Sequence, residues 1–381
     1  MPWNNTSVKQ MRFEFVKQAL KGNKVFIDLC KSFGISTKTG YKWIRRYVEG
    51  GIESLEDRSR RPINQPNATP QEIEDLIIAV RKQYSSWGAK KIRPFLIKRY
   101  PEILLPSETT ISNILKRKGY TTKRRNKLKL AETPILEEAT QPNQVWTIDF
   151  KGWWKTGDDK ICEPFTVQDM YSRYILYCEP VTKRTGNNIW SIMEELFKKY
   201  GMPERCRSDN GPPFASLGIG RLTSFVIRLV RAGITPEWIR PGKPQDNGKH
   251  ERMHRIIKAE VALEPAPTLA KQRLQLQEFQ PYYNDIRPHE ALDGKTPSEI
   301  YLPSDRLWIG ADQSPEYPDD YLVRKVGLSG QINVHGHEVF ISERLKRDFV
   351  GLKEQSQGTY DIFYGPLILG TFCTTQGFER S

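Results

Sequence analysis

Residues 205–214 read R-C-R-S-D-N-G-P-P-F, and residues 244–254 read P-Q-D-N-G-K-H-E-R-M-H. The first segment predicts a short strand that ends in a turn, and the second predicts the start of a long helix. Upstream, V-W-T-I-D-F at residues 145–150 predicts another strand, whose alternate side chains point to opposite faces. Each segment offers one carboxylate, and the three are Asp149, Asp209 and Glu251.

Three carboxylates from separate elements can converge only around positive charge. Mg²⁺ is a hard cation that a few carboxylates, water and phosphate commonly hold. Two such ions about 3.5–4 Å apart activate an attacking oxygen and stabilise a leaving one. We therefore expect Asp149, Asp209 and Glu251 to bind two Mg²⁺ ions, with Mn²⁺ as the alternative metal. Taken singly, each acid reads better as an ordinary turn or surface carboxylate.

The positive charge of the chain is concentrated at its beginning. The 381 residues, enough for two to four domains, carry a net charge of +14. Residues 1–130 hold 28 Lys and Arg against 11 Asp and Glu, a net of +17, and the other 251 residues hold 31 against 34, a net of −3. A basic front part and a nearly neutral rear part indicate nucleic-acid binding, mainly through the front.

Cysteine usage and hydropathy indicate a reducing compartment. The five cysteines are scattered without a C-x-x-C pair, which argues against a structural zinc site and a disulfide framework. No apolar signal region opens the chain, and no run of about 18 apolar residues occurs. We expect a cytoplasmic protein with no membrane contact.

The first 50 residues predict a helix-turn-helix. Helices over 7–20 and 25–33 precede G-I-S-T-K-T-G-Y-K-W-I-R-R-Y at 34–47, where Gly34 suits the turn and Ser36 caps the next helix. The alternative is a three-helix bundle with a solvated basic face. We expect the outward face of the last helix to contact DNA through Lys38, Thr39, Lys42, Arg45 and Arg46.

A basic linker and a second helical unit follow. In the linker, we expect Arg58, Arg60 and Arg61 to contact phosphates or a minor groove. Three helices follow: one begins at Pro70 behind a Thr69 cap, and the others span 87–100 and 106–120. This second helix-turn-helix would face DNA through Thr109, Thr110, Asn113 and Lys116. The tail to residue 130 is a basic stretch without apolar period, equally a solvated charge run.

From residue 144 the pattern changes to strands followed by helices. Three strands predict an antiparallel meander, and the helices and short strands that follow suggest a mixed α/β sheet. Residues 303–320 read as a linker, with Pro303, Pro315 and Pro318. Five or six short strands over residues 321–372 predict a small closed barrel.

The motifs V-W-T-I-D-F, S-D-N-G-P-P-F and P-Q-D-N-G-K-H-E-R-M-H-R-I-I-K resemble the catalytic core of retroviral integrases and of related bacterial insertion-sequence transposases. Y-Y-N-D-I-R-P-H-E-A-L-D-G-K-T-P-S-E-I-Y is also typical of those transposases. The resemblance implies a ribonuclease-H-like core with Asp149, Asp209 and Glu251 as its metal-binding D, D, E set. It also implies a domain order: helix-turn-helix domains at 1–62 and 63–122, a basic linker at 123–140, the core at 141–302, a linker at 303–320 and the barrel at 321–381.

Two departures favour a transposase over an integrase. The zinc-binding His/His/Cys/Cys domain of retroviral integrases is missing, and helix-turn-helix units stand in its place. The 41 residues between Asp209 and Glu251 exceed the usual spacing in retroviral integrases. We expect the extra length in a loop over residues 217–225.

The helix that carries Glu251 has a second interpretation. H-E-R-M-H at 250–254 is the H-E-x-x-H pattern of zinc peptidases, with histidines one turn apart. The positive side chains around the motif would repel a dication but suit a phosphate backbone. A peptidase would also leave Asp149 and Asp209 without a role. In the transposase reading, this helix grips DNA with His250, His254 and five cations: Lys243, Lys249, Arg252, Arg255 and Lys258.

We therefore predict a DNA transposase of an insertion sequence, associated with the bacterial nucleoid. Its helix-turn-helix units would bind terminal inverted repeats. Its core would hydrolyse a phosphodiester and then join the freed 3′-hydroxyl to target DNA, both in-line displacements at phosphorus that one metal site serves. Two DNA ends must meet, so we expect at least a homodimer. The alternatives are a metal-dependent nuclease, a DNA-binding regulator with an inactive core and, remotely, the zinc peptidase.

Overall fold

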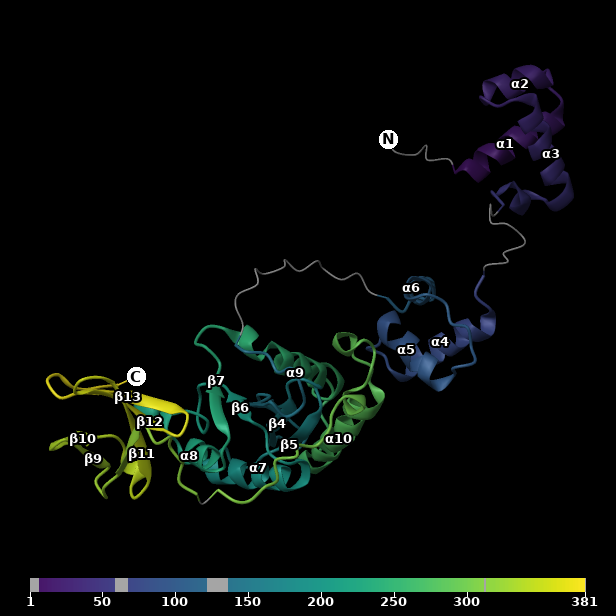
Figure 1. Cartoon of the computed structure of the whole chain (residues 1–381). Helices are drawn as coiled ribbons and strands as arrows, with labels where there is room; N and C mark the ends of the chain where they lie inside the picture. The colour runs from purple at the N-terminus through teal and green to yellow at the C-terminus, as the bar shows by residue number, and fades with distance from the viewer. Residues whose placement is uncertain (1–6, 59–67, 122–135, 312, 381) are drawn as a thin grey trace. The chain divides into compact units, whose positions relative to one another are not determined.

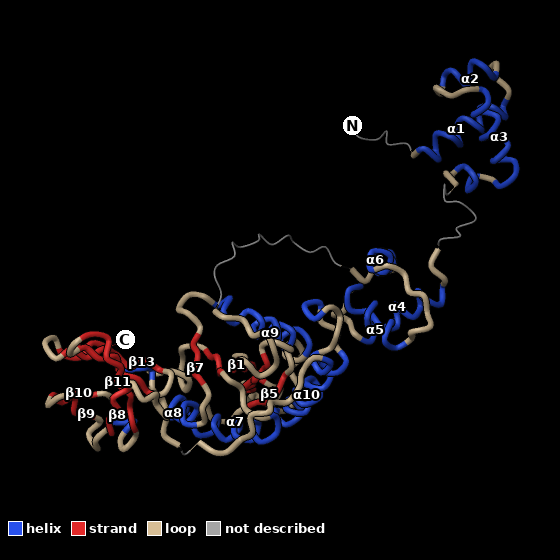
Figure 2. Tube along the Cα trace, viewed as in Figure 1, coloured by secondary structure: helices blue, strands red, loops and turns tan. Residues whose placement is uncertain are grey.

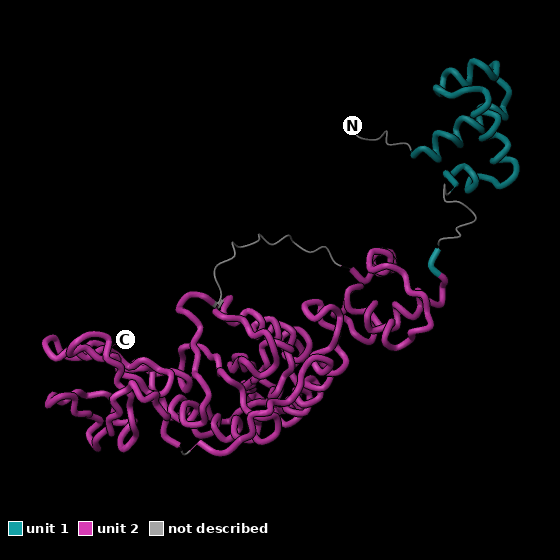
Figure 3. Tube along the Cα trace, in the orientation of Figure 1, with its two compact units in different colours: residues 1–69 teal, residues 70–381 magenta. Residues whose placement is uncertain are grey.

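The computed structural model describes residues 7–58, 68–121, 136–311 and 313–380. The chain divides into two compact units, residues 1–69 and residues 70–381 (Figure 3). The basic linker residues Arg60 and Arg61, and most of the predicted linker at 123–140, lie outside the described residues. Within the described ranges, no helix is long and apolar enough to cross a membrane.

The first unit is a three-helix fold made of α1 (Val8–Lys21), α2 (Phe26–Ser32) and α3 (Thr37–Gly50), followed by the short 3₁₀ turn η1 (Ile52–Leu55). The predicted cap of α3 is confirmed, because the Ser36 hydroxyl accepts a hydrogen bond from the Thr39 N–H at 3.2 Å. A methyl group on Gly40 would lie 2.8 Å from Cys30 Sγ and 2.9 Å from two phenylalanine rings. The α3 backbone therefore approaches α1 and α2 too closely for any larger residue there.

The second unit begins with another three-helix module, made of α4 (Gln71–Gln83), α5 (Ala89–Arg99) and α6 (Glu108–Arg117). Ser107 caps α6 as predicted, whereas the residue that precedes α4 is Pro70 rather than the predicted cap Thr69. Trp87 is fully buried at the centre of the module. Its indole N–H donates to the Tyr282 hydroxyl of the core at 2.9 Å, and the Tyr84 ring stacks on both of these rings.

The core contains a five-stranded mixed sheet in the order β5-β4-β1-β6-β7 (Figures 1 and 2). The strands β1 (Val145–Phe150), β4 (Pro164–Asp169) and β5 (Ile175–Pro180) are antiparallel, which confirms the predicted meander. The strands β6 (Arg205–Ser208) and β7 (Thr235–Trp238) then add in parallel to β1. A short ribbon of β2 (Trp154–Lys155) and β3 (Ile161–Cys162) lies outside this sheet.

Helices cover both faces of the sheet. One face packs against α7 (Gly186–Tyr200) and α8 (Ser224–Arg231) through residues such as Trp146 and Ile148. The other face meets α9 (Gly248–Glu260) and α10 (Leu269–Pro281). Alternation along β1 sends its apolar side chains to the first face and leaves Thr147 and Asp149 on the α9 face. The sheet therefore has one apolar face and one partly polar face.

The C-terminal region consists of strands, but these strands do not close into a barrel. β8 (Tyr321–Lys325), β11 (Phe349–Ser356), β12 (Thr359–Tyr364), β13 (Leu367–Cys373) and β14 (Gly377–Arg380) form an open sheet in the order β14-β13-β12-β11-β8. β9 (Gln331–Val334) and β10 (His337–Phe340) form a separate hairpin. The predicted closed barrel is therefore not confirmed.

The C-terminal sheet shares its apolar cluster with the core. Leu222, Val226 and Val230, from α8 and the turn before it, pack with residues such as Ile362 and Leu369. The segment 217–225, predicted as an added loop, thus contains the short turn η2 (Ile219–Arg221) and the start of α8. It docks the C-terminal strands instead of projecting freely.

Candidate active site

Two of the predicted acids leave the sheet at the same edge. β1 and β6 are parallel neighbours, and Thr147 pairs with Arg207. Two residues further along each strand are Asp149 and Asp209, so the register brings both to the carboxyl ends of adjacent strands. The side chain of Asp209 then accepts a hydrogen bond from the Gly211 N–H at 3.1 Å, which stabilises the turn after β6.

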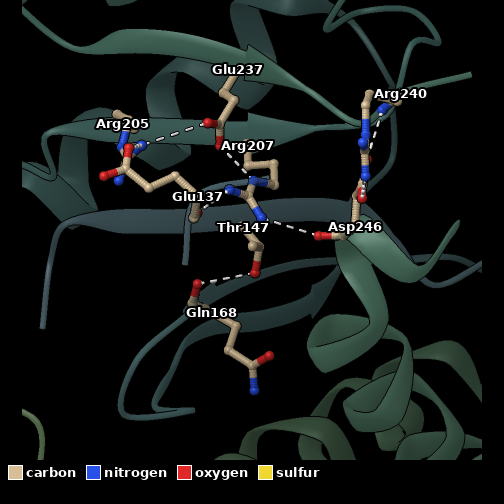
Figure 4. A network of polar contacts seen from close by, with 8 residues as sticks. All are labelled: Glu137, Thr147, Gln168, Arg205, Arg207, Glu237, Arg240 and Asp246. Atoms are coloured by element: carbon tan, nitrogen blue, oxygen red, sulfur yellow. Dashed lines mark hydrogen bonds and ion pairs between the residues drawn. The ribbon is translucent and has the colours of Figure 1, made fainter. Parts of the chain in front are cut away.

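The third acid comes from α9, whose start is anchored by a buried ion pair. Asp246 lies in the short turn η3 (Pro244–Asn247) just before the helix. It accepts hydrogen bonds from the Arg240 N–H at 3.1 Å and from the Arg240 guanidinium at 2.8 and 2.7 Å (Figure 4). These bonds hold the pKa of Asp246 below its usual range. Glu251, in the first turn of α9 and exposed, is positioned through this anchor.

A buried arginine joins four segments behind the acids. Arg207 on β6 is fully buried, and its guanidinium donates to Glu237 Oε2 on β7 at 2.5 Å. The same group donates to the carbonyl oxygens of Glu137 at 2.8 Å and Asp246 at 3.1 Å (Figure 4). One cation therefore connects two strands, the segment before β1 and the turn before α9. Removing one partner from such a pair is strongly destabilising because the other stays buried without compensation.

The electrostatics of Asp149 show that the three acids influence one another. Burial, followed by repulsion from Asp209, raises the pKa of Asp149 to about 7, and Glu251 raises it too. The hydrogen bond that the Phe150 N–H donates at 2.7 Å acts in the opposite direction. Charge repulsion of this kind needs carboxylates close to one another. The side chains of the three acids offer the hard oxygens that Mg²⁺ prefers.

The two histidines of α9 do not share the DNA-facing side on which the sequence suggested them. His250 is fully buried, and its ring nitrogens share hydrogen bonds with Thr147 Oγ1 at 2.6 Å and Thr166 Oγ1 at 2.7 Å. His254 shares a bond with Thr166 at 2.8 Å. Burial lowers the pKa of His250 to about 3 and that of His254 to about 2, so both rings are neutral. They attach α9 to the polar side of the sheet.

The histidines also bear on the zinc-peptidase alternative. Within the described ranges, a single group of three His, Cys, Asp or Glu side chains has all its ligand atoms within 4.8 Å, namely Asp149, His250 and His254. A catalytic zinc site keeps one coordination position open to substrate. Here the imidazole nitrogens face buried threonine hydroxyls, which does not favour a peptidase. Asp209 and Glu251 lie outside this group.

The other cations predicted on α9 have different surroundings. Lys249 is half-buried and forms an ion pair with Glu138 at 3.1 Å, and Lys243 is half-buried in the turn before the helix. Three cations are exposed along α9: Arg252, Arg255 and Lys258. The exposed cations flank Glu251 in sequence, which suits contact with a phosphate backbone next to the acids.

The helix-turn-helix residues are mostly at the surface. On α3, Lys38, Lys42 and Arg45 are exposed, whereas Arg46 lies over the Trp43 ring at 5.0 Å. Thr39 bonds the capping serine of α3, and on α6 Thr110 bonds the capping serine Ser107. The remaining predicted positions are also exposed: Arg58, Thr109, Asn113 and Lys116.

Several residues that shape the site escaped the sequence analysis. Thr147 and Thr166 hold the histidines, and Arg207 holds the turn before α9. The available signal was the alternation of polar with apolar residues in two strands otherwise rich in apolar side chains. That pattern predicts a polar face of the sheet but does not predict which residues contact that face.

Models of known domain families match most of the chain before the C-terminal strands. Two models described as "Integrase core domain" match residues 139–244 and 232–297. A model described as "Helix-turn-helix domain" matches residues 11–63, and one described as "Homeodomain-like domain" matches residues 39–115.

Similar curated proteins come from bacterial insertion elements. The insertion element IS476 uncharacterized 39.2 kDa protein of Xanthomonas euvesicatoria is 22% identical over 238 residues, which cover 62% of this chain and 66% of that protein. The insertion element IS407 uncharacterized 31.7 kDa protein of Burkholderia multivorans is 26% identical over 193 residues, covering 50% of this chain and 67% of that protein. The chain thus spans about two thirds of the length of these relatives.

Among solved structures, the HTLV-2 integrase catalytic core domain in complex with magnesium is 20% identical. It covers 43% of this chain and 99% of that chain, with a TM-score of 0.34. The family matches and the insertion-element relatives carry the assignment. The chain therefore contains an integrase core domain preceded by helix-turn-helix domains, and it is similar to proteins of bacterial insertion elements.

Proposed function

We propose that this protein is a DNA transposase that binds the terminal inverted repeats of an insertion sequence, cleaves a phosphodiester there and joins the freed end to target DNA. The observation that carries the proposal is the parallel pairing of β1 with β6, which brings Asp149 and Asp209 to the ends of adjacent strands, and Glu251 adds to the raised pKa of Asp149. The integrase-core match spans all three acids, and the helix-turn-helix matches supply DNA-binding modules before them.

The donor set fits a divalent cation. Repulsion among the acids raises the pKa of Asp149, and a bound cation between them would remove that penalty. Asp149, Asp209 and Glu251 would hold Mg²⁺, or Mn²⁺ in its place, as two ions. When bound, such ions polarise the phosphoryl group and stabilise both the attacking and the leaving oxygen.

The chain's own residues hold these donors and the DNA in place. The Asp246–Arg240 pair and the buried Arg207 fix the turn from which α9 presents Glu251. Neutral His250 and His254 attach the helix to the sheet without adding positive charge that would compete for the acids. The exposed cations of α9 would hold the phosphate backbone next to the acids. Two DNA ends have to meet in one reaction, so we propose at least a homodimer.

Strand transfer by the purified full chain tests this function. The protein is incubated with Mg²⁺, a labelled duplex carrying the element's end and a supercoiled target plasmid, beside Asp209→Asn and Glu251→Gln. Glu264→Gln, which removes an exposed carboxylate just beyond α9, is the matched control. We expect joined product from the wild type and the control and none from the two active-site variants, with end binding kept in all four.

Other outcomes would identify the alternatives. Cleavage without joining indicates a metal-dependent nuclease. Binding of the ends without either reaction indicates a DNA-binding regulator. Joining that survives Asp209→Asn contradicts the assignment of the acids.

A further inference from the structure

A second polar site lies in a cleft of about 640 Å³ between the second helical module and the core. Its walls come from the start of α5, the exposed side of α6, the start of α9 and the chain after α10. Six cationic side chains line it: Lys90, Lys91, Arg173, Lys249, Arg252 and Arg287. Two carboxylates line it, Glu108 and Glu290. The cleft is therefore strongly positive.

Protein carboxylates neutralise only part of this charge. Lys90 pairs with Glu290, Lys249 with Glu138 at 3.1 Å, and Arg287 with Glu260 at 2.6 Å. Among the residues that the structure describes, no carboxylate lies within ion-pair distance of Lys91, Arg173 or Arg252. Cations gathered in a partly enclosed space without counter-charges repel one another, and an anion would remove that repulsion.

Buried donors at the floor of the cleft also lack partners. Arg287 is only 3% exposed, and its Nη1 donates to Glu260 and, at 2.8 Å, to the Tyr282 hydroxyl, but its Nε has no partner in the described part of the chain. The buried Nε2 of His289 likewise has none there. Unsatisfied buried polar atoms are rare in proteins, and such atoms next to a cavity are commonly satisfied by ordered water, an ion or a ligand.

The proton affinities of the lining groups agree with this geometry. Burial, followed by repulsion from Arg287, lowers the pKa of Lys91 to about 8. Burial, followed by Arg287 and Lys91, lowers the pKa of His289 to about 3. Burial is also the main cause of the lowered pKa of Arg173. These groups have an electrostatic environment that favours an added negative charge.

The remaining lining side chains define the chemistry of the ligand. Thr109, Ser112 and Asn113 on the exposed side of α6 add hydroxyl and amide donors opposite the cations. Guanidinium, ammonium, hydroxyl and amide donors around one space suit phosphate oxygens. The volume exceeds what one phosphate fills, and part of the lining comes from the helix that carries Glu251.

We propose that this cleft binds the phosphate backbone of a DNA strand between α6 of the second helical module and α9 of the core. The proposal rests on the proposed function only in naming DNA as the nucleic acid. It assigns Arg287 to the floor of the phosphate site and Lys91 and Arg252 to its walls. Arg252 follows Glu251 directly on α9, so the cleft and the acids share that helix.

The test measures the salt dependence of DNA binding by the full chain without divalent metal. Each phosphate contact contributes about 0.9 to the slope of log K against log salt, and about fivefold in affinity at 0.15 M salt. Lys91→Gln and Arg252→Gln should therefore each weaken binding of a labelled duplex about fivefold and reduce the slope by about 0.9. Lys271→Gln, an exposed cation on α10 outside the cleft, should leave both unchanged. Thermal unfolding of each variant confirms that it folds.

Two results would overturn the proposal. The first is an unchanged affinity and slope in both folded cleft variants. The second is a cleft that takes only a small anion: inorganic phosphate raises the unfolding temperature of the wild type but not of the variants, while their DNA binding is unaltered. Because no metal is present, a failure of strand transfer does not affect this experiment.

Discussion

Replacing Arg207 by Met tests the buried network behind the acids. The change removes hydrogen bonds to the Glu237 carboxylate and to the carbonyl oxygens of Glu137 and Asp246. Breaking a buried ion pair on one side costs about 3–5 kcal/mol. The Glu237 side chain is 18% exposed, so water compensates part of its loss, and we expect the lower end, about 3 kcal/mol.

Arg184→Met is the matched control in the same core. Arg184 also pairs with a glutamate, Glu163, but its side chain is 48% exposed. Half-exposed pairs contribute at most about 1 kcal/mol. Both variants lose an ion pair with a glutamate, but only Arg207→Met also loses buried hydrogen bonds to backbone carbonyls.

Hydrogen exchange of the full chain, read by mass spectrometry on peptides from β1 and β6, measures the opening free energy of the core without mixing in the helical modules. We expect Arg207→Met to lower it by about 3 kcal/mol, which speeds exchange of the most protected amides roughly a hundredfold. Equal, small losses in both variants would refute the reasoning that Arg207 holds these segments together.

Three further outcomes are expected. Because the folded pKa of Asp149 is raised to about 7, the folded state binds its proton more tightly than the unfolded state does. The metal-free protein should therefore lose core stability as the pH rises from about 4 to 7. In thermal unfolding, this loss should vanish in Asp149→Asn and shrink in the wild type with Mg²⁺. The pKa of Lys91 is about 8, so DNA affinity should fall between pH 7 and 9 as the lysine loses its proton, and equilibrium titration of Lys91→Gln should show a flatter profile. Gly40→Val should unfold the first unit, because even a Cβ atom there would lie 2.8 Å from Cys30 Sγ. Hydrogen exchange of the α1–α3 amides should then speed up while the amides of the core stay protected. An α3 that stays protected would contradict the packing argument.

Local motifs lead to the prediction of the three acids, two of which sit at a recognisable boundary of a helix or strand. Asp209 follows a short strand at a polar turn, and Glu251 opens a helix after one. The helices and strands of the core are set by short-range periodicity, which a sequence carries directly. What the motifs lacked was register: only the pairing of β1 with β6 shows that Asp149 and Asp209 leave the sheet side by side.

The elements that sequence analysis missed depend on contacts between distant residues. Positive neighbours on α9 suggested that His250 and His254 faced outward, yet threonines from two strands bury them. The C-terminal strands were expected, but whether a sheet closes depends on which edges pair, and that is not a local property. Trp87 and Tyr282, 195 residues apart, meet without any sequence pattern that links them.

The first residues of helix α9 contact three different parts of the protein. His250 faces the sheet, Glu251 belongs with the acids, and Lys249 and Arg252 line the cleft. Each residue along an α-helix turns the side-chain direction by about 100°, because one turn takes 3.6 residues. A single inserted or deleted residue near Gly248 would therefore rotate all three assignments at once, whereas a substitution alters only one. We expect this stretch to tolerate changes of residue type far better than changes of length.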